Sequence, residues 1–291
     1  MKAIVGVGYM KQCLAGVDIF ARLRFPKSEA VLVHAVEPVL PDGGFMPTAA
    51  INPITEIQTQ RQRDGENRMA EVAAELQKLG IPSRSVTRFG NPAHEITEVA
   101  REETADLIIS GSSKKGKLES FFMGSVTRAL VVDAQRSFLV GKRGVDGDKI
   151  DAVFATDHSE YSQKCLAKLI ELAPGRFGKI TVVSANTVDA NLHDLLQLAS
   201  QESNETISMN DFMLEKNDEV CEKLQPICDE VSSVVLRGHV NDVINSVMED
   251  ARADLLILGA HGHGFIKRLL VGSTSMHMVG SEPWNVLVIR V

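Results

Sequence analysis

Residues 253–275 read ADLLILGAHGHGFIKRLLVGSTS, and this stretch decides the fold. Its apolar run, Leu255 to Leu258, has the length and composition of a strand that is buried on both faces of a sheet. A glycine-rich loop follows this run, and Gly272-Ser273-Thr274 then opens a helical pattern. A buried strand, a glycine loop and a helix in this order are typical of an α/β protein with a parallel sheet.

The same pattern occurs earlier in the chain. Gly111 and Gly259 are 148 positions apart, and an ungapped alignment at this offset gives the identical pairs Ala105/Ala253, Asp106/Asp254, Leu107/Leu255, Ile109/Ile257, Gly111/Gly259, Gly116/Gly264, Gly124/Gly272 and Ser125/Ser273. The two halves are therefore copies of one unit. The polar, glycine-rich segment from Gly141 to Asp148 predicts the boundary between them, with domains at 1–143 and 149–291.

Short Val, Ile and Leu runs alternate with amphipathic stretches in each half. In the second half the runs predict strands, and the sequence from Asn241 to Ala251 predicts a helix whose apolar residues share one face. The expected strands are 149–156, 178–185, 231–237, 253–258 and 285–290. The pattern predicts two tandem, doubly wound α/β domains, each with a five-stranded parallel sheet. Such sheets bind ligands beyond the carboxyl ends of their strands.

The bulk composition excludes several classes of protein. A net charge of −7 disfavours a general electrostatic attraction to nucleic acid or to anionic membranes. The apolar run from Ala3 to Val7 is too short for a signal peptide or a membrane span, so we expect a buried strand there. The 4 cysteines form neither a C-x-x-C metal pair nor a dense disulfide framework. We therefore expect a cytoplasmic protein.

The loop after residue 258 has the chemistry of an anion site. Glycine lets the backbone approach a ligand closely, and the helix that opens at Gly272, Ser273 and Thr274 offers free N–H groups to phosphate. Lys267 and Arg268 place positive charge in the same loop. Asp157, after the first strand of this half, is suited to bind ribose hydroxyls, an adenine amine or Mg²⁺.

On these residues the chain resembles the universal stress protein family, specifically its tandem-domain members. Gly259, Gly262, Gly272 and Ser273 match the ATP-binding signature of that family, G-x2-G-x9-G-[ST], in the correct strand-to-helix context. The segments Thr156 to Ser159 and Pro283 to Val288 also match family patterns. The resemblance implies the adenine nucleotide alpha hydrolase-like fold, which is the universal stress protein fold.

The resemblance also implies a ligand and the residues that hold it. The ligand is ATP or a related adenine nucleotide, with Mg²⁺ as an optional companion. Asp157 lies beside the nucleotide, the backbone at Ala185 meets adenine, and the glycine-rich loop holds ribose and phosphates. The candidate nucleotide-binding residues are Thr156, Asp157, Ala185, Gly259, His261, Gly262, Gly272, Ser273 and Thr274.

The first half departs from this pattern at two positions. Lys114 stands where the second glycine belongs, and Gly8 stands where the second half has Asp157. A side chain at position 114 crowds the backbone approach, and the loss of the carboxylate removes an anchor. Gly124-Ser125 still leaves half of a phosphate site. We therefore interpret the first domain as degenerate.

Other readings of individual motifs are weaker. Gly6-Val7-Gly8 imitates a dinucleotide fingerprint but lacks its third glycine. His261 and His263 could form a metal pair, although residues that flank phosphate suit their position better. Cys221 and Cys228 could share a helix face, but Pro226 should end or kink that helix, and buried thiols are the simpler reading.

Three functional hypotheses remain open at this point. The first is a nucleotide-responsive regulator or adaptor of the stress response; no catalytic residue is assigned, because no nucleophile is paired with a base. The second is a slow ATPase or phosphoryl-transfer enzyme that uses Asp157, Lys267 and the histidine pair. The third is a nucleotide-independent adaptor whose acidic segment, 187–217, binds another protein.

The last strand of each half predicts how the halves meet. Phe138 to Val140 and Val286 to Ile289 are apolar enough to pair and to be covered. We expect them to pair antiparallel, because an exposed strand edge of this kind invites aggregation. The chain would then be a dimer-like assembly of its own two halves, and a homodimer of chains would need another surface.

Overall fold

The structure is a computed structural model of the 291-residue chain. It describes residues 1–8, 13–38, 48–111, 113–114, 121–133, 135–175, 177–187, 209–261 and 271–291. The acidic segment of the third hypothesis and the middle of the glycine loop lie largely outside these ranges.

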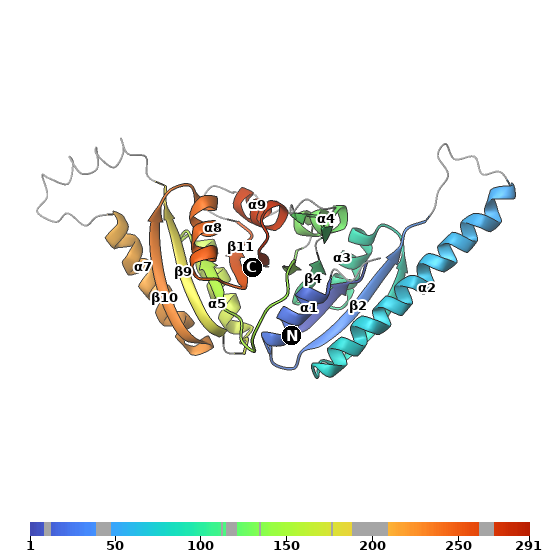
Figure 1. The fold of residues 1–291 in the computed structure, drawn as a ribbon, viewed down its shortest axis with the longest axis horizontal. Helices are drawn as coiled ribbons and strands as arrows, with labels where there is room; N and C mark the ends of the chain where they lie inside the picture. The colour runs from blue at the N-terminus through green and yellow to red at the C-terminus, as the bar shows by residue number, and fades with distance from the viewer. Residues whose placement is uncertain are drawn as a thin grey trace, which may run out of the picture.

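The first half alternates strands and helices, as the sequence predicts. Its elements are β1 (Lys2–Gly6), α1 (Leu14–Arg22), β2 (Glu29–Val36), α2 (Thr48–Lys78), β3 (Ser83–Phe89), α3 (Pro92–Glu102), β4 (Leu107–Gly111), α4 (Ser125–Asp133) and β7 (Ser137–Gly141). Two short strands, β5 (Ser113–Lys114) and β6 (Phe121–Phe122), form a separate hairpin-like pair that the sequence analysis does not predict. The helix α2 has 31 residues, and its first turns run past the end of the sheet (Figure 1).

The second half repeats this order. Its elements are β8 (Ala152–Ala155), α5 (Glu160–Glu171), β9 (Phe177–Asn186), α7 (Met209–Leu224), the 3-10 turn η2 (Gln225–Ile227), β10 (Cys228–Arg237), α8 (Val240–Asp250), β11 (Leu255–Gly259), α9 (Ser273–Ser281) and β12 (Asn285–Ile289). Each predicted strand is present with its ends shifted by a few residues, and the predicted helix 241–251 is α8.

The described strands of both halves form one ten-stranded sheet in the order β10-β9-β8-β11-β12-β7-β4-β1-β2-β3. Within each half, neighbouring strands are parallel. At the centre, β12 and β7 run antiparallel, with Leu287 opposite Leu139. The predicted parallel sheets and the predicted antiparallel pairing of the last strands are both confirmed.

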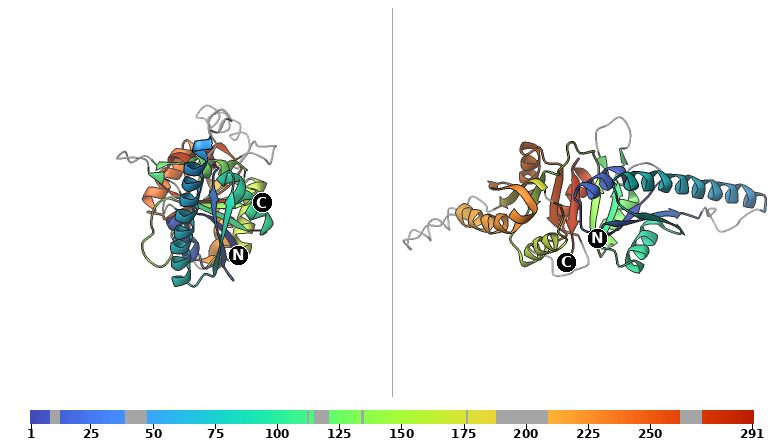
Figure 2. Two further views of the ribbon diagram at one scale, coloured as in Figure 1. Left: turned by 90° about the vertical axis from the view of Figure 1, so that its right-hand side faces the viewer. Right: turned by 90° about the horizontal axis from the view of Figure 1, so that it is seen from below.

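Helices cover both faces of this sheet, and each face has one apolar cluster that contains residues of both halves. The helices α1, α2, α5 and α7 contribute to one cluster, and α3, α4, α8 and α9 contribute to the other. Figure 2 shows helices on both sides of the twisted sheet. The four apolar residues of α8 that the sequence placed on one face, Val243, Ile244, Val247 and Met248, are all buried. The two halves therefore share continuous cores across the junction.

Hydrogen bonds at the junction repeat the internal symmetry of the sequence. Just after β7, the backbone N–H groups of Lys142 and Arg143 donate to Asn285 Oδ1 at 2.7 and 3.0 Å. Just after β12, the N–H of Arg290 donates to Ser137 Oγ at 3.1 Å. Lys142 and Arg290 are 148 positions apart, and so are Ser137 and Asn285. Each half therefore accepts an equivalent hydrogen bond from the residue that follows the last strand of the other half.

Several smaller expectations can be checked in the described residues. The helix α7 ends at Leu224, before Pro226, and Cys228 opens β10, so Cys221 and Cys228 do not share a helix face. Trp284 is buried, and its Nε1 donates to Asn245 Oδ1 at 2.8 Å. Among the described helices, none is long and apolar enough to span a bilayer.

The central strand pair provides a stability test. Leu139 has no exposed surface and faces Leu287, so Leu139→Ala removes packing that both halves share. We expect the free energy of unfolding to fall by about 2–5 kcal/mol, in a single urea transition that shifts as a whole. The control is Leu79→Ala, because Leu79 is 46% exposed, and it should change stability by less than about 0.5 kcal/mol. Two separate transitions in the wild-type protein would show that the halves unfold independently.

Lys142 provides a pH test of the same junction. Burial lowers the pKa of Lys142 from 10.5 to about 7, although the nearby carboxylate of Glu282, which is paired with His277, opposes this shift. Between about pH 7 and pH 10 the unfolded chain therefore binds a proton that the folded chain has lost. The free energy of unfolding of the wild type, relative to Lys142→Met, should rise with pH in this window and stay flat below it. Urea titrations measure this difference in the free energy of unfolding between the two proteins. If it were constant from about pH 6 to pH 9, Lys142 would not have the lowered pKa of a buried amine.

Candidate functional site

The carboxyl ends of β8 and β11 form the edge of the sheet where the candidate residues gather. These strands are parallel neighbours, with Ile257 opposite Phe154. Thr156 and Asp157 follow β8 directly, and Gly259 ends β11. The register therefore brings Asp157 and the start of the glycine loop to the same edge, as the sequence predicts.

The two described ends of the glycine loop are fastened to each other. The N–H of Gly272 donates to the Ala260 carbonyl at 2.7 Å, and Ser275 Oγ donates to the Gly259 carbonyl at 2.8 Å. The loop thus leaves the sheet and returns to the same point before α9 begins. Residues 262–270, which include Gly262, His263, Lys267 and Arg268, lie outside the described residues.

The start of α9 has the geometry of an anion site. Gly272 is the N-cap residue, and the first helical hydrogen bond runs from the N–H of Met276 to the Gly272 carbonyl at 3.0 Å. The N–H groups of residues 273–275 therefore have no acceptor within the helix. Ser273 is exposed and Thr274 is partly exposed, and free N–H groups at the start of a helix suit an anion.

The floor beneath the start of the loop is apolar and uncharged. A Cβ atom added at Gly259 would lie 3.1 Å from Cys165 Sγ and 3.3 Å from Tyr161 Cε1, so glycine fits closely there. The ring of Tyr161 meets the ring of His261 edge-on, with centroids 4.9 Å apart. Burial raises the pKa values of Cys165 and Tyr161 to about 12, so Cys165 is a thiol and not a thiolate nucleophile at neutral pH.

His261, at the start of the loop, is also neutral at pH 7. Burial lowers the pKa of His261, and the positive charge of Arg290 lowers it further. At neutral pH this imidazole therefore adds no positive charge to the site.

Asp157 lies exposed at the sheet edge in a defined turn. Its Oδ1 accepts a hydrogen bond from the N–H of Ser159 at 3.0 Å, and the next residue, His158, has a positive φ of 59°. Thr156 is anchored below it, because its N–H donates to the Val183 carbonyl at 3.0 Å. The turn thus fixes the direction in which the carboxylate leaves the sheet.

A buried polar network supports this turn from below. Ser184 Oγ lies 3.0 Å from the Thr156 carbonyl oxygen, 3.0 Å from His158 Nε2 and 2.7 Å from Asn217 Oδ1. Asn217 Nδ2 donates to the Val234 carbonyl at 3.2 Å, which fixes the orientation of the amide. Because Ser184 has one hydroxyl proton and two acceptors, His158 Nε2 is the donor to its oxygen.

The network links both sides of the candidate site. Ser184 precedes Ala185, the residue expected to meet adenine, and Ala185 is partly exposed near the end of β9. Thr156 precedes Asp157 at the end of β8. One set of hydrogen bonds therefore fixes the ends of two neighbouring strands.

Comparison with known proteins now identifies the family. The model of the universal stress protein family matches residues 1–142 and, a second time, residues 151–290. The chain belongs to the universal stress protein family. Because each half is matched separately, it is a tandem member.

Individual relatives agree with this assignment. A Methanocaldococcus jannaschii universal stress protein, MJ0577, is 31% identical over 88 residues, which are 30% of this chain and 54% of that protein. A Thermus aquaticus universal stress protein is 33% identical over 106 residues, which are 36% of this chain and 70% of that protein. The first match thus spans about half of its relative. The crystal structure of an Archaeoglobus fulgidus universal stress protein covers 99% of this chain and 98% of its own, with a TM-score of 0.63 and 17% identity, and shares the fold.

The first universal stress protein unit differs where the second has polar groups. Sheet register places Gly8 at the position of Asp157, and His34 at the position of Ser184. His34 Nδ1 lies 2.8 Å from the Val7 carbonyl oxygen, in the same relation as Ser184 to Thr156. The buried His34 therefore has a structural contact with the end of β1.

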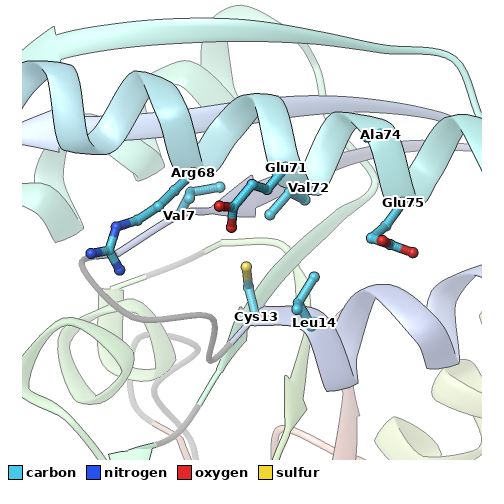
Figure 3. A pocket seen from close by; sticks show the side chains of 8 residues that line it. All are labelled: Val7, Cys13, Leu14, Arg68, Glu71, Val72, Ala74 and Glu75. Carbon is cyan, nitrogen blue, oxygen red and sulfur yellow. The ribbon is translucent and has the colours of Figure 1, made fainter.

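This unit also contains a cavity of about 320 Å³ between α1 and α2 (Figure 3). Its lining residues are Val7, Cys13, Leu14, Arg68, Glu71, Val72, Ala74 and Glu75. The Cys13 side chain points toward α2, and burial raises the pKa of its thiol to about 11. The cavity lies in the first unit, whose glycine loop is altered, and none of its lining residues belongs to the glycine loop of the second unit.

Sequence reasoning missed His158, Ser184 and Asn217 as members of the site. The repeat contains a clue to Asn217. At the offset of 148, two buried apolar residues of α2 have apolar counterparts in α7, namely Leu76 with Leu224 and Val72 with Val220. The buried Met69, in contrast, has the polar counterpart Asn217. An amide in an otherwise apolar helix face predicts a buried partner.

The network can be tested by stability. Ser184→Ala leaves Asn217 Oδ1 without its hydroxyl donor, and we expect a loss of about 1–3 kcal/mol in the free energy of unfolding. Adding Asn217→Met, the residue of the first unit, should recover part of this loss. Ser233→Ala is the control, because that hydroxyl binds the exposed Asp218. Urea titrations that give equal values for Ser184→Ala and the control would show that the network contributes no stability.

Proposed function

We propose that the second unit binds ATP or a related adenine nucleotide, and that the protein acts as a nucleotide-responsive regulator or adaptor of the stress response. One observation carries this proposal: the G-x2-G-x9-G-S signature spans β11 and α9 at the sheet edge that also holds Asp157. Family membership supports the same ligand class, because the signature is the one by which the chain resembles nucleotide-binding members.

Each part of the nucleotide has a matching group in this arrangement. The N–H groups and hydroxyls of Ser273 and Thr274 would take the phosphates. Asp157 would accept hydrogen bonds from ribose hydroxyls, and the backbone at Ala185 would meet adenine. Thr156, Gly259, His261, Gly262 and Gly272 would shape the loop around these groups.

The site fits Mg²⁺ only as a companion of the phosphates. In the described part of the chain, no cluster of three or more His, Cys, Asp or Glu side chains could hold a metal ion. Asp157 would be a carboxylate ligand at this edge, and Mg²⁺ commonly keeps water and phosphate ligands beside one or two carboxylates.

A slow ATPase is the second candidate. The lowered pKa of His261 favours it, because a neutral imidazole can accept a proton at pH 7. A regulator requires no such step. Turnover of labelled ATP by the same purified sample separates the two: a regulator retains intact nucleotide, and an ATPase releases phosphate.

The simplest test of the loop replaces one residue of the second unit with the residue type at the same position of the first unit. Gly262→Lys introduces the residue type found at Lys114, and its side chain would occupy space that ribose and phosphates need. We expect calorimetric affinity for ATP to fall at least about tenfold. Gly144→Lys is the matched control, because a Cβ at Gly144 meets no atom within 4 Å and the residue lies in the segment between the units. Unchanged affinity in Gly262→Lys would refute the loop assignment.

A further inference from the structure

The last helix of the second unit is held by a residue of the first unit. Lys142, one residue beyond β7, extends its amine to the carboxyl-terminal end of α9, where Nζ donates to the Met278 carbonyl at 3.0 Å and to the Glu282 carbonyl at 2.6 Å. The last carbonyls of a helix lack partners within it, and an amine that donates to them supplies hydrogen bonds that the helix itself cannot make. Lys142 therefore caps α9 from outside its own unit.

A second contact from the first unit meets the same helix. The short strand β6 packs against α9, and a Cβ added at Gly280 would lie 3.4 Å from Met123 Cε. Met123 directly precedes Gly124-Ser125, the remaining half of the first unit's phosphate loop. Figure 1 shows α9 and α4 side by side at the junction. Two contacts from the first unit thus converge on α9.

The arrangement is reciprocal. Arg290, the counterpart of Lys142, donates from Nη2 to the Val131 carbonyl of α4 at 2.8 Å. Both α4 and α9 follow a Gly-Ser pair at the end of a glycine loop. Each such helix therefore has its loop at one end and a basic side chain of the opposite unit that donates to a backbone carbonyl nearer the other end. The two contacts come from equivalent positions of the repeat, although they reach different carbonyls.

The length of α9 connects its two ends. The helix has 9 residues, so it is about 13 Å long, and its hydrogen-bonded backbone moves as one short rod. The proposed phosphate donors, Ser273 and Thr274, are at one end, and the carbonyls that accept from Lys142 are at the other. The two ends therefore belong to one short hydrogen-bonded element.

We propose that Lys142 is a positioning residue for the nucleotide site of the second unit: the first unit, through this cap, preorganises the phosphate-binding end of α9. The first unit then contributes to affinity without binding a nucleotide itself. This inference rests on the proposed function, and the experiment below separates the failure of one from the failure of the other.

The test uses three variants of the full chain. Lys142→Met removes the cap and keeps a side chain of similar length. Lys142→Arg keeps a hydrogen-bond donor, and the contact of Arg290 with α4 shows that arginine suits the equivalent position. Arg143→Met is the matched control: Arg143 lies in the same segment and donates to the Ala253 carbonyl at 2.6 Å, which is not part of α9.

The readout is the affinity for ATP compared with the affinity for adenosine, which lacks phosphates. Lys142→Met should weaken ATP binding roughly threefold or more and leave adenosine binding within about twofold, because α9 meets only the phosphates. Lys142→Arg should restore ATP affinity, and Arg143→Met should not change the ratio. Equal weakening of both ligands by Lys142→Met, or an unchanged ATP affinity, would overturn the proposal.

Hydrogen exchange provides a readout that needs no nucleotide. In the free protein, Lys142→Met should increase amide exchange in α9 selectively, whereas Arg143→Met should not. If the wild type bound neither ATP nor adenosine, the proposed function would fail while this exchange result still tested the cap. Exchange in α9 that is the same in the wild type and in Lys142→Met would show that the cap does not order the helix.

Discussion

The antiparallel pairing of β7 with β12 is the constraint on which the rest of the structure depends. Both strands are buried along their entire lengths, so neither unit could leave this edge exposed to water. Pairing them inside one chain creates a single ten-stranded sheet and two cores that cross the junction. It also brings the segment after each last strand against the last helix of the opposite unit, which produces the caps by Lys142 and Arg290.

Within this symmetric frame the two units have diverged at the sheet edge. The second unit has Asp157, Ser184 and Asn217, where the first has Gly8, His34 and Met69. In the second unit these residues supply a carboxylate and a buried network that joins Ser184 to Asn217. In the first unit Gly8 supplies no carboxylate, and His34 repeats only the contact with the strand end, at the Val7 carbonyl. The two copies of one fold therefore differ in the polar groups at the edge of their sheets, while each unit contacts the last helix of the other.

Much of this could be predicted from sequence because it depends on local pattern. Apolar runs such as Leu255 to Leu258 predicted the strands, the 148-residue offset predicted the duplication, and the apolar character of Val286 to Ile289 predicted the central pairing. The cap on α9 could not be predicted, because Lys142 and Glu282 are far apart in sequence and their contact depends on the register of β7 with β12. The network around Ser184 depends in the same way on three elements that meet only in the folded chain. The assignments of Gly262 and the loop cations remain sequence predictions.

We infer that duplication left one functional nucleotide site in a chain with two copies of the fold. Calorimetric titration of the wild-type protein with ATP measures this directly, because the number of sites per chain is independent of any substitution. We expect one nucleotide per chain. Two sites of similar affinity would contradict the proposed difference between the units, and no binding would contradict the assignment of the loop itself.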